Sequence, residues 1–436
     1  MSLPSPHDCT PAPVTAFDPG HGADDVDSVR AWLRLAIAVA VITIGSVGMY
    51  VVVVVLPAVQ AEFGIARADA SLPYAMTLIG YGGGSLIMGR LTDRFGVFVP
   101  TVLGAVMLGV GFAWAAFAGS LASFAAAQGL MIGVGSSAAF VPLLTDTSFW
   151  FARRRGIAVA ISASGNYLGG ALWPPVIQHF IDTEGWRGTY LGIGIASSLI
   201  VIALALGLRR PRPMPAVAPA AAAGAGDSGD ERPLGLSPGA LTALLSVAGV
   251  ACCVAMSMPQ VHIVAYCGDL GYGPARGAQM LSLMLAAGIV SRLVSGLICD
   301  RIGGLRTLVL GSCLQGVALL LFLPFDGLAS LFVISALFGL FQGGIVPSYA
   351  IIVRELFPPA QAGTRVGVVL TATMLGMALG GWMSGRIFDL TGSYDAAFVN
   401  GVAWNLVNLT IALALLTRLR RRESAGSRST PRAARA

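Results

Sequence analysis

The 436-residue sequence predicts an all-α membrane protein whose twelve transmembrane helices form two pseudo-symmetric bundles of six. Composition is the first reason, because 56% of the residues are hydrophobic and only 11% are charged, against roughly 25% charged in a soluble globular protein. A water-soluble chain of this length needs far more polar surface, whereas a bilayer solvates long apolar segments. The other two reasons are a polar motif that occurs twice and a polar break between two sets of apolar segments.

Twelve apolar segments follow one another along the chain when it is scanned in windows of about 20 residues. They lie near residues 34–57, 71–89, 98–119, 121–144, 157–181, 189–208, 239–266, 278–299, 305–324, 328–352, 365–388 and 396–417. Glycine interrupts nearly every segment, and glycine lets transmembrane helices approach one another closely. The segments therefore predict helices that pack against helices.

A stretch rich in Pro, Ala, Gly and charge separates the first six segments from the last six. Its composition does not bury enough apolar surface to fold alone, so it predicts a linker. The predicted organisation is a cytoplasmic tail at 1–30, a six-helix bundle at 31–208, a cytoplasmic linker at 209–238, a second bundle at 239–418 and a cytoplasmic tail at 419–436.

The arginines predict the orientation, since the chain has no lysine and 22 of its 27 arginines fall in loops and tails on one side of the predicted helices. Positive loops stay in the cytoplasm, so we expect a multi-pass protein of a bacterial inner membrane with both termini cytoplasmic. The net charge of +6 is spread over these loops. This distribution fits contact with the lipid bilayer better than binding to nucleic acid.

Several kinds of chemistry have no motif in the sequence. The six cysteines and four histidines show no ligand spacing, so we expect no metal site. No phosphate-binding glycine loop and no nucleophile constellation occur, so we expect neither an ATP-driven pump nor an enzyme, and no cofactor. An ion or solute gradient is then the expected driving force.

The duplicated motif reads Gly-Arg-Leu-Thr-Asp-Arg-Phe-Gly at 89–96 and Gly-Leu-Ile-Cys-Asp-Arg-Ile-Gly at 296–303. Glycine permits a tight turn, aspartate can cap a helix N-terminus and arginine can pair with a carboxylate. A single copy also fits a solvated loop, but two copies in register favour a conformational latch. Its expected residues are Gly89, Asp93, Arg94, Gly96, Asp300, Arg301 and Gly303.

With this motif after the second segment of each half, residues 30–418 resemble the major facilitator superfamily, whose fold consists of two six-helix bundles. A narrower resemblance begins at Phe-Ala-Arg-Arg-Arg-Gly-Ile-Ala (151–158) and Ser-Gly-Asn-Tyr-Leu-Gly (164–169). Taken alone, Gly165 and Gly169 also fit ordinary helix packing, and the arginines fit membrane anchors. Together with Gly-Trp-Arg (185–187) and Asp-Leu-Thr-Gly-Ser-Tyr (389–394), they resemble the monocarboxylate transporter and oxalate-formate antiporter-like family.

Arg292 is the residue on which the predicted function depends. It precedes Asp300 by eight residues, which places it roughly 12 Å inside the interface of a core about 30 Å thick. A guanidinium at that depth costs at least about 2.5–3.5 kcal/mol and should face a cavity and seek an anion. Its fork of donors matches a carboxylate, although hydrogen bonds to carbonyls, Asn or Gln of neighbouring helices are an alternative. The resemblance implies that Arg292 binds the substrate carboxylate.

The chain departs from that family in its charged residues. Animal members place a Lys on the first helix and an Asp one turn before this Arg, and the oxalate-formate exchangers place a Lys on the eleventh helix. Here there is no Lys, and the position four before Arg292 is Gly288. Arginine does not titrate, so proton coupling needs another group, and His262 is the candidate, with hydrogen-bonded packing as the alternative.

Further polar side chains are candidates for the cavity wall, since tyrosine hydroxyls could complete the hydrogen bonds of a carboxylate. They are Tyr50, Tyr74, Tyr81, Asn166, Tyr167, Tyr266 and Tyr349, of which Tyr50, Asn166, Tyr266 and Tyr349 are expected to bind substrate with Arg292. Asp146 is expected to pair with a nearby arginine.

The sequence therefore predicts a secondary active transporter for a small organic anion, a short monocarboxylate such as lactate or pyruvate, that works by alternating access. Proton symport and anion exchange are both open. The alternatives are an efflux carrier for hydrophobic compounds and a non-transporting membrane sensor, which usually carries a signalling domain that is not evident here.

Overall fold

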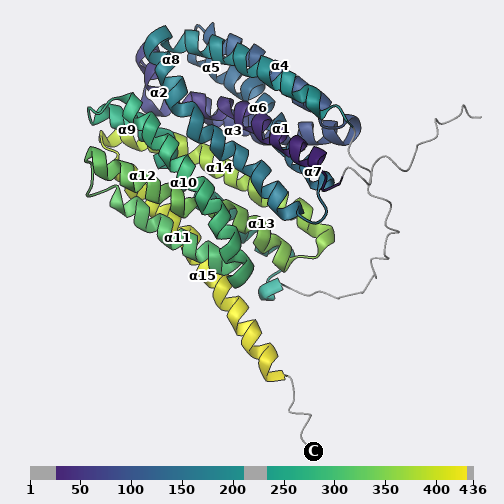
Figure 1. The fold of residues 1–436 in the computed structure, drawn as a ribbon. Helices are drawn as coiled ribbons and strands as arrows, with labels where there is room; N and C mark the ends of the chain where they lie inside the picture. The colour runs from purple at the N-terminus through teal and green to yellow at the C-terminus, as the bar shows by residue number, and fades with distance from the viewer. Residues whose placement is uncertain (1–25, 211–232, 430–436) are drawn as a thin grey trace, which may run out of the picture.

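The computed structural model describes residues 26–210 and 233–429, so most of the predicted N-terminal tail and linker lie outside the described residues. The described chain is helical, with two halves stacked along an extended interface. In Figure 1 the first half, coloured purple to teal, lies above the second half, coloured green to yellow. The predicted all-α architecture with two bundles of six helices is confirmed.

The first half begins with a span broken at Ser46 and ends with a long helix that turns at Gly185, where φ is +71°. Its helices are α1 (Val29–Gly45), α2 (Val47–Phe63), α3 (Arg67–Phe95), α4 (Phe98–Ala116), α5 (Leu121–Ala126), a π-helical turn (Ala127–Gly133), α6 (Val134–Ala138), α7 (Val141–Trp150) and α8 (Arg155–Ala205), followed by a short 3₁₀ turn (Leu206–Leu208).

The second half repeats this order with fewer breaks. After a 3₁₀ turn (Pro233–Gly235), its helices are α9 (Pro238–Asp269), α10 (Pro274–Ile302), α11 (Gly304–Leu321), α12 (Leu328–Gln342), α13 (Ile345–Leu356), α14 (Pro359–Thr391) and α15 (Asp395–Ser429). The predicted segment boundaries agree with these helices to within a few residues, except that α15 runs well past the predicted end of the last span. Arginine is the commonest residue of that extension, and arginine favours a helix.

The fourth span of each half is interrupted at the same place. A Val-Pro dipeptide follows the break in both halves, at Val141-Pro142 and Val346-Pro347. Proline lacks an N–H group and clashes with the preceding turn, so a helix tends to restart at it. The shared break is a second internal repeat, beside the motif at Asp93 and Asp300.

Twelve spans follow from the helices within residues 26–210 and 233–429. Ten helical stretches are long and apolar enough to cross a membrane, and one of them, Gly156–Leu208, is long enough for two spans separated at Gly185. The remaining span is α3, which is 29 residues long but less apolar because glycine and charged residues interrupt it. It nevertheless packs along α14 of the other half.

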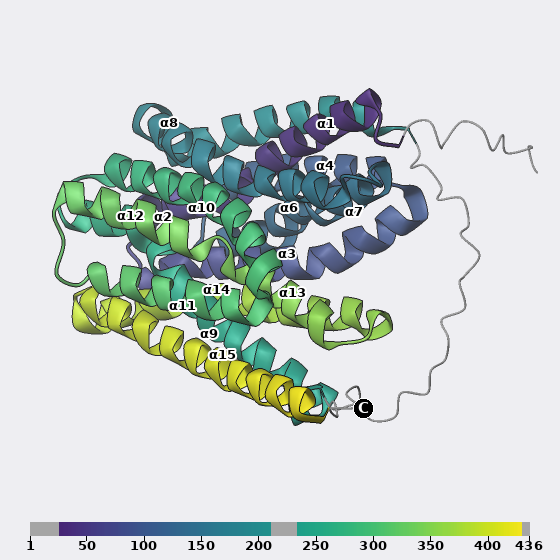
Figure 2. The same ribbon diagram turned by 60° about the horizontal axis from the view of Figure 1, so that its bottom comes forward.

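The interface between the halves has three main helix pairs. Helix α3 packs against α14, α8 against α10, and α2 against α9. Figures 1 and 2 show α8 beside α10 in both views. The buried apolar cluster of the second half includes Val53, Tyr74 and Tyr167 of the first half, so the halves share one core around the candidate site.

Candidate substrate-binding site

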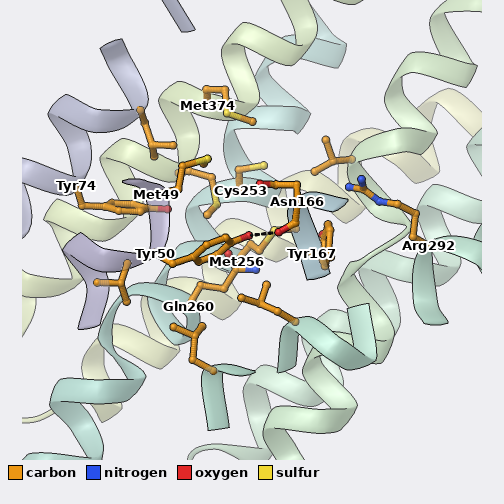
Figure 3. Close-up of a pocket in the computed structure, with 16 residues that line it drawn as sticks. Met49, Tyr50, Tyr74, Asn166, Tyr167, Cys253, Met256, Gln260, Arg292 and Met374 are labelled. Carbon is orange, nitrogen blue, oxygen red and sulfur yellow. Dashed lines mark hydrogen bonds between the residues drawn. The ribbon is translucent and has the colours of Figure 1, made fainter. Parts of the chain in front are cut away.

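A cavity of about 130 Å³ lies between the halves. The first half supplies its wall from α2, α3 and α8, and the second half from α9, α10, α13 and α14. The lining residues, most of which are apolar, are Met49, Tyr50, Val53, Tyr74, Leu78, Asn166, Tyr167, Cys253, Met256, Gln260, Leu281, Leu285, Arg292, Val346, Met374 and Met377. Figure 3 shows this cavity in close-up. A site shared by both halves is where a substrate can be held while the halves move.

Arg292 is the one charged side chain among the residues that line the cavity. Its guanidinium carbon lies 4.4 Å from the centre of the Tyr167 ring, so α10 and α8 meet here through a cation–π contact. Its Nε is buried and has no hydrogen-bond partner, and no described acid lies within 4.0 Å of the guanidinium. Figure 3 shows the guanidinium aimed at the cavity. At Nε, therefore, the alternative of an arginine satisfied by neighbouring polar groups is not met.

Tyr167 also explains why the position four before Arg292 is glycine. A Cβ atom on Gly288 would lie 2.4 Å from Cε1 and 2.7 Å from Cδ1 of the Tyr167 ring. Any side chain at this position would therefore displace the ring on which Arg292 stacks. An acid one turn before Arg292, as in the animal members of the family that the sequence resembles, has no room here.

Some of the neutral polar groups of the cavity have no hydrogen-bond partner among the described residues. Tyr50 donates its hydroxyl to the main-chain oxygen of Asn166 at 3.1 Å. The side-chain amides of Asn166 and Gln260 have no hydrogen bond to any described residue, yet both line the cavity. Uncommitted amides beside a guanidinium offer donors and acceptors to a bound molecule.

Three of the predicted site residues lie away from the cavity. The Tyr349 hydroxyl donates to Oδ1 of Asn408 at 2.7 Å inside the second half, and Tyr266 packs edge-on against Tyr394 and Phe398. His262 is fully buried, with its Nε2 2.8 Å from the Gly381 carbonyl oxygen and its Nδ1 without a partner. The cavity thus brings together Tyr50, Asn166 and Arg292 with Tyr74 and Tyr167. The other candidates, Tyr81, Tyr266, Tyr349 and His262, do not line it.

The sequence did not single out the methionines or Gln260. Met49, Met256, Met374 and Met377 all line the cavity, yet methionine inside an apolar segment gives no signal of its own. The only available hint is that Met374 and Met377 are three residues apart and so share a helix face.

Polar contacts join the halves at one end of the bundle, around Arg67. Nη1 of Arg67 donates to Asp269 at 3.0 Å and to the Tyr394 hydroxyl, while Asp389 accepts the main-chain N–H groups of Arg67 and Ala68 at 2.8 Å each. Asp389 therefore caps helix α3 from the opposite half. Burial raises the pKa of the Tyr394 hydroxyl, so this group stays neutral. We call Arg67, Asp269, Asp389 and Tyr394 the Arg67 clamp.

The motifs that carried the narrower resemblance have structural roles. The loop at 389–394 supplies two members of the Arg67 clamp. Arg187 binds Glu62 at 2.7 Å and the carbonyl oxygen of Ala118 at 2.9 Å, all within the first half. A Cβ on Gly169 would lie 2.0 Å from the Ser46 hydroxyl, which confirms the helix-packing interpretation of that glycine.

The duplicated motif lies at the end of the bundle opposite the Arg67 clamp. Gly96 and Gly303 have φ values of +74° and +84°, which only glycine adopts easily. Asp93, Arg94, Asp300 and Arg301 are exposed, and Gly89 has open space around it. Glu355, and not Asp300, accepts the N–H of Gly304 at 3.1 Å and so caps α11. The latch role of the motif stays a prediction.

Beside the first copy of the motif lies a buried ion pair. Nε of Arg34 donates to Asp146 at 2.7 Å and its Nη2 donates to the same carboxylate at 3.2 Å, with both side chains 7% exposed. The Trp150 ring covers the guanidinium at 4.6 Å. The prediction that Asp146 pairs with an arginine is confirmed.

Known proteins with similar sequences and folds agree with this architecture. The family profile described as Major Facilitator Superfamily matches residues 37–330 and 244–435. The chain is 29% identical over 343 residues to Monocarboxylate transporter 13 of Bos taurus, covering 76% of each chain, and 26% identical over 404 residues to Monocarboxylate transporter 11 of Homo sapiens, covering 90% of this chain and 84% of the relative.

Solved structures show the same fold at low sequence identity. A bacterial homolog of the human lysosomal transporter Spinster, in an inward-facing and occupied conformation, superposes with a TM-score of 0.68 at 14% identity, covering 90% of this chain and 97% of that one. The nucleoside transporter NupG gives 0.66 at 16% identity, covering 89% and 99%. The chain therefore belongs to the Major Facilitator Superfamily of transporters, as a member similar to the monocarboxylate transporters.

Proposed function

We propose that this protein is a secondary active transporter that carries a small organic anion, a monocarboxylate, with the carboxylate bound at Arg292. The observation that carries the proposal is that Arg292 is the one charged residue of a cavity between the halves and has a buried Nε without a partner. A guanidinium that is partly buried without a counter-ion is unfavourable. A bound carboxylate would supply the missing charge and accept two parallel hydrogen bonds from it.

Alternating access would move this cavity from one side of the membrane to the other. The Arg67 clamp closes one end of the interface through a charged contact between the halves, and such contacts can break when the halves rock apart. With both termini in the cytoplasm, as the arginine distribution favours, the clamp lies on the outer face of a bacterial inner membrane and the duplicated motif on the inner face.

Uptake into proteoliposomes tests the role of Arg292. The variant Arg292→Ala should lose carboxylate uptake, because no other charged group lines the cavity in the described part of the chain. Arg276→Ala is the matched control, since Arg276 lies on the same helix and is exposed. Uptake that is undiminished in Arg292→Ala would rule out the proposal.

If a proton is the coupling ion, His262 is the candidate residue that would carry it. It does not line the cavity, but its ring centre lies 5.8 Å from that of Tyr394 in the Arg67 clamp, so a proton there would act through the clamp. His262→Ala should abolish accumulation driven by an imposed proton gradient and leave carboxylate exchange intact. If gradient-driven accumulation persists in this variant, the protein exchanges anions or uses another proton carrier.

A second candidate function is efflux of hydrophobic compounds. Ten of the sixteen lining side chains are aliphatic or sulfur-bearing, and the chain is 24% identical over 334 residues to the Agnestins efflux protein AgnL12 of Paecilomyces divaricatus, covering 77% of this chain and 75% of the relative. Transport of an uncharged hydrophobic compound that is equally fast in Arg292→Ala would favour this function over carboxylate transport.

A further inference from the structure

The cavity is lined by an unusual number of sulfur atoms. Four methionines and Cys253 come from α2, α9 and α14, and thus from both halves. Figure 3 shows Met49, Met256, Met374 and Cys253 gathered on one side, with Arg292 on the other. Methionine sulfur is polarizable, adapts to irregular shapes and makes favourable contacts with the edges of aromatic rings. The wall opposite the charge therefore suits a large, polarizable apolar body.

A short acid does not use this wall. Lactate or acetate carries only one or two carbons beyond its carboxylate, so an acid held at Arg292 leaves the methionines without partner atoms. Side chains that line an empty space lose their dispersion contacts. A larger body that reaches the methionines restores these contacts and removes its own apolar surface from water.

The aromatic side chains favour a flat body. Tyr50, Tyr74 and Tyr167 line the same cavity, and rings pack best in offset or edge-to-face arrangements with other rings. Because the Arg292 guanidinium carbon lies over the Tyr167 ring, the N–H groups directed away from that ring are the ones that can face a carboxylate.

The charge balance restricts the substrate to one anionic group. Among the described residues, no acid and no second cation line the cavity, so a second carboxylate or an ammonium group would be desolvated without a partner. Dicarboxylates and zwitterionic amino acids are disfavoured for this reason.

We propose that the monocarboxylate bound at Arg292 has an aromatic body, an arylcarboxylate of about the size of benzoate or phenylacetate, whose ring lies among Met49, Met256, Met374 and Met377. The inference rests on the proposed function and narrows it from short aliphatic acids to aromatic acids.

Competition in proteoliposomes containing the full chain tests the substrate class. Radiolabelled phenylacetate is the probe, and unlabelled benzoate, acetate, lactate, succinate and phenylalanine are the competitors. Benzoate should compete about tenfold or more better than acetate or lactate, because it buries a ring that they lack. Succinate and phenylalanine should compete weakly, because each brings a second charge into the cavity.

A filling substitution tests the position of the ring. Met374→Trp places a large side chain in the cavity and should raise the KM for phenylacetate more than the KM for lactate. Leu375→Trp is the matched control, because the neighbouring Leu375 is 52% exposed on the outer face of the same helix and does not line the cavity. The competition experiment uses the unmodified protein, so it still tests the substrate class if Met374→Trp does not fold.

The outcomes separate this inference from the function on which it rests. Arg292-dependent uptake in which lactate and acetate compete as well as benzoate overturns the aromatic substrate and leaves monocarboxylate transport standing. An equal rise in KM for phenylacetate and lactate in Met374→Trp overturns the placement of the ring. If no carboxylate is carried in an Arg292-dependent way, both proposals fail.

Discussion

The guanidinium of Arg292 lies 4.4 Å from the centre of the Tyr167 ring, so the single charge of the cavity rests on an aromatic side chain of the opposite half. This contact positions the charge, because Arg292 has no ion-pair partner among residues 26–210 and 233–429. Movement of α8 relative to α10 would therefore move the binding group itself.

Replacing Tyr167 tests this positioning. Tyr167→Leu should weaken carboxylate binding roughly two- to thirtyfold, since a cation–π contact contributes about 0.5–2 kcal/mol. Tyr167→Phe keeps the ring and should bind nearly as well as the unmodified protein. Calorimetric titration of the purified protein with the carboxylate measures both, and equal affinities for the leucine and phenylalanine variants would contradict the contact.

Gly288 and Gly296 form a matched pair on α10. An added methyl group at Gly288 collides with the Tyr167 ring, whereas one at Gly296 meets nothing within 4 Å. Gly288→Ala should lower both carboxylate uptake and stability, by about 1–3 kcal/mol for overpacking. Gly296→Ala should be neutral or slightly stabilising, because alanine favours a helix. Thermal unfolding in detergent and uptake assays check this, and a fully active Gly288→Ala variant would show that the ring is free to move.

The Arg67 clamp should control the equilibrium between the two states. Arg67→Ala removes the ion pair with Asp269 and the contact with Tyr394, so the halves should separate more often at this end. Spin labels at positions 69 and 275, both exposed at this end, in a variant without native cysteines should then report longer distances. Arg276→Ala is the control, and an unchanged distance distribution in Arg67→Ala would show that the clamp does not hold the halves together.

Asp146 should be important for stability. Asp146→Asn leaves Arg34 buried without its counter-charge, and breaking a buried pair in this way costs about 3–5 kcal/mol. Asp93→Asn, an exposed position at the same end, should change stability far less. Thermal unfolding of both variants in detergent checks the difference, and similar melting temperatures would mean that the buried pair contributes little.

The sequence was most informative where a single physical rule applied. A charge deep in an apolar segment is unfavourable, so Arg292 could be singled out from its depth alone. Gly96 and Gly303 could be placed at turns because each ends a polar motif after an apolar segment, and both have positive φ.

The sequence was least informative about the direction in which side chains of apolar helices point. Helix α9 is apolar on nearly every face, so its amphipathicity does not distinguish a cavity-facing residue such as Gln260 from His262 or Tyr266. For Tyr349 and the methionines, too, the sequence does not show whether the side chain points into the cavity. Packing between helices that are distant in sequence decides these directions.

The Arg67 clamp shows a second limit. No sequence pattern marks Arg67 as part of a contact between the halves, because Asp389, which accepts its main-chain N–H, lies in the other half of the chain. Nothing local to either residue reveals the pairing, which depends on how the halves pack.

The most direct test of the central claim compares an acid with its neutral amide. Phenylacetate and phenylacetamide have nearly the same shape, so calorimetric titration of each into the purified protein isolates the contribution of the negative charge. We expect phenylacetate to bind much more tightly than phenylacetamide to the unmodified protein, and the two to bind equally weakly to Arg292→Gln. Binding of phenylacetate that is unchanged in Arg292→Gln would contradict the claim that Arg292 is the counter-charge of the transported anion.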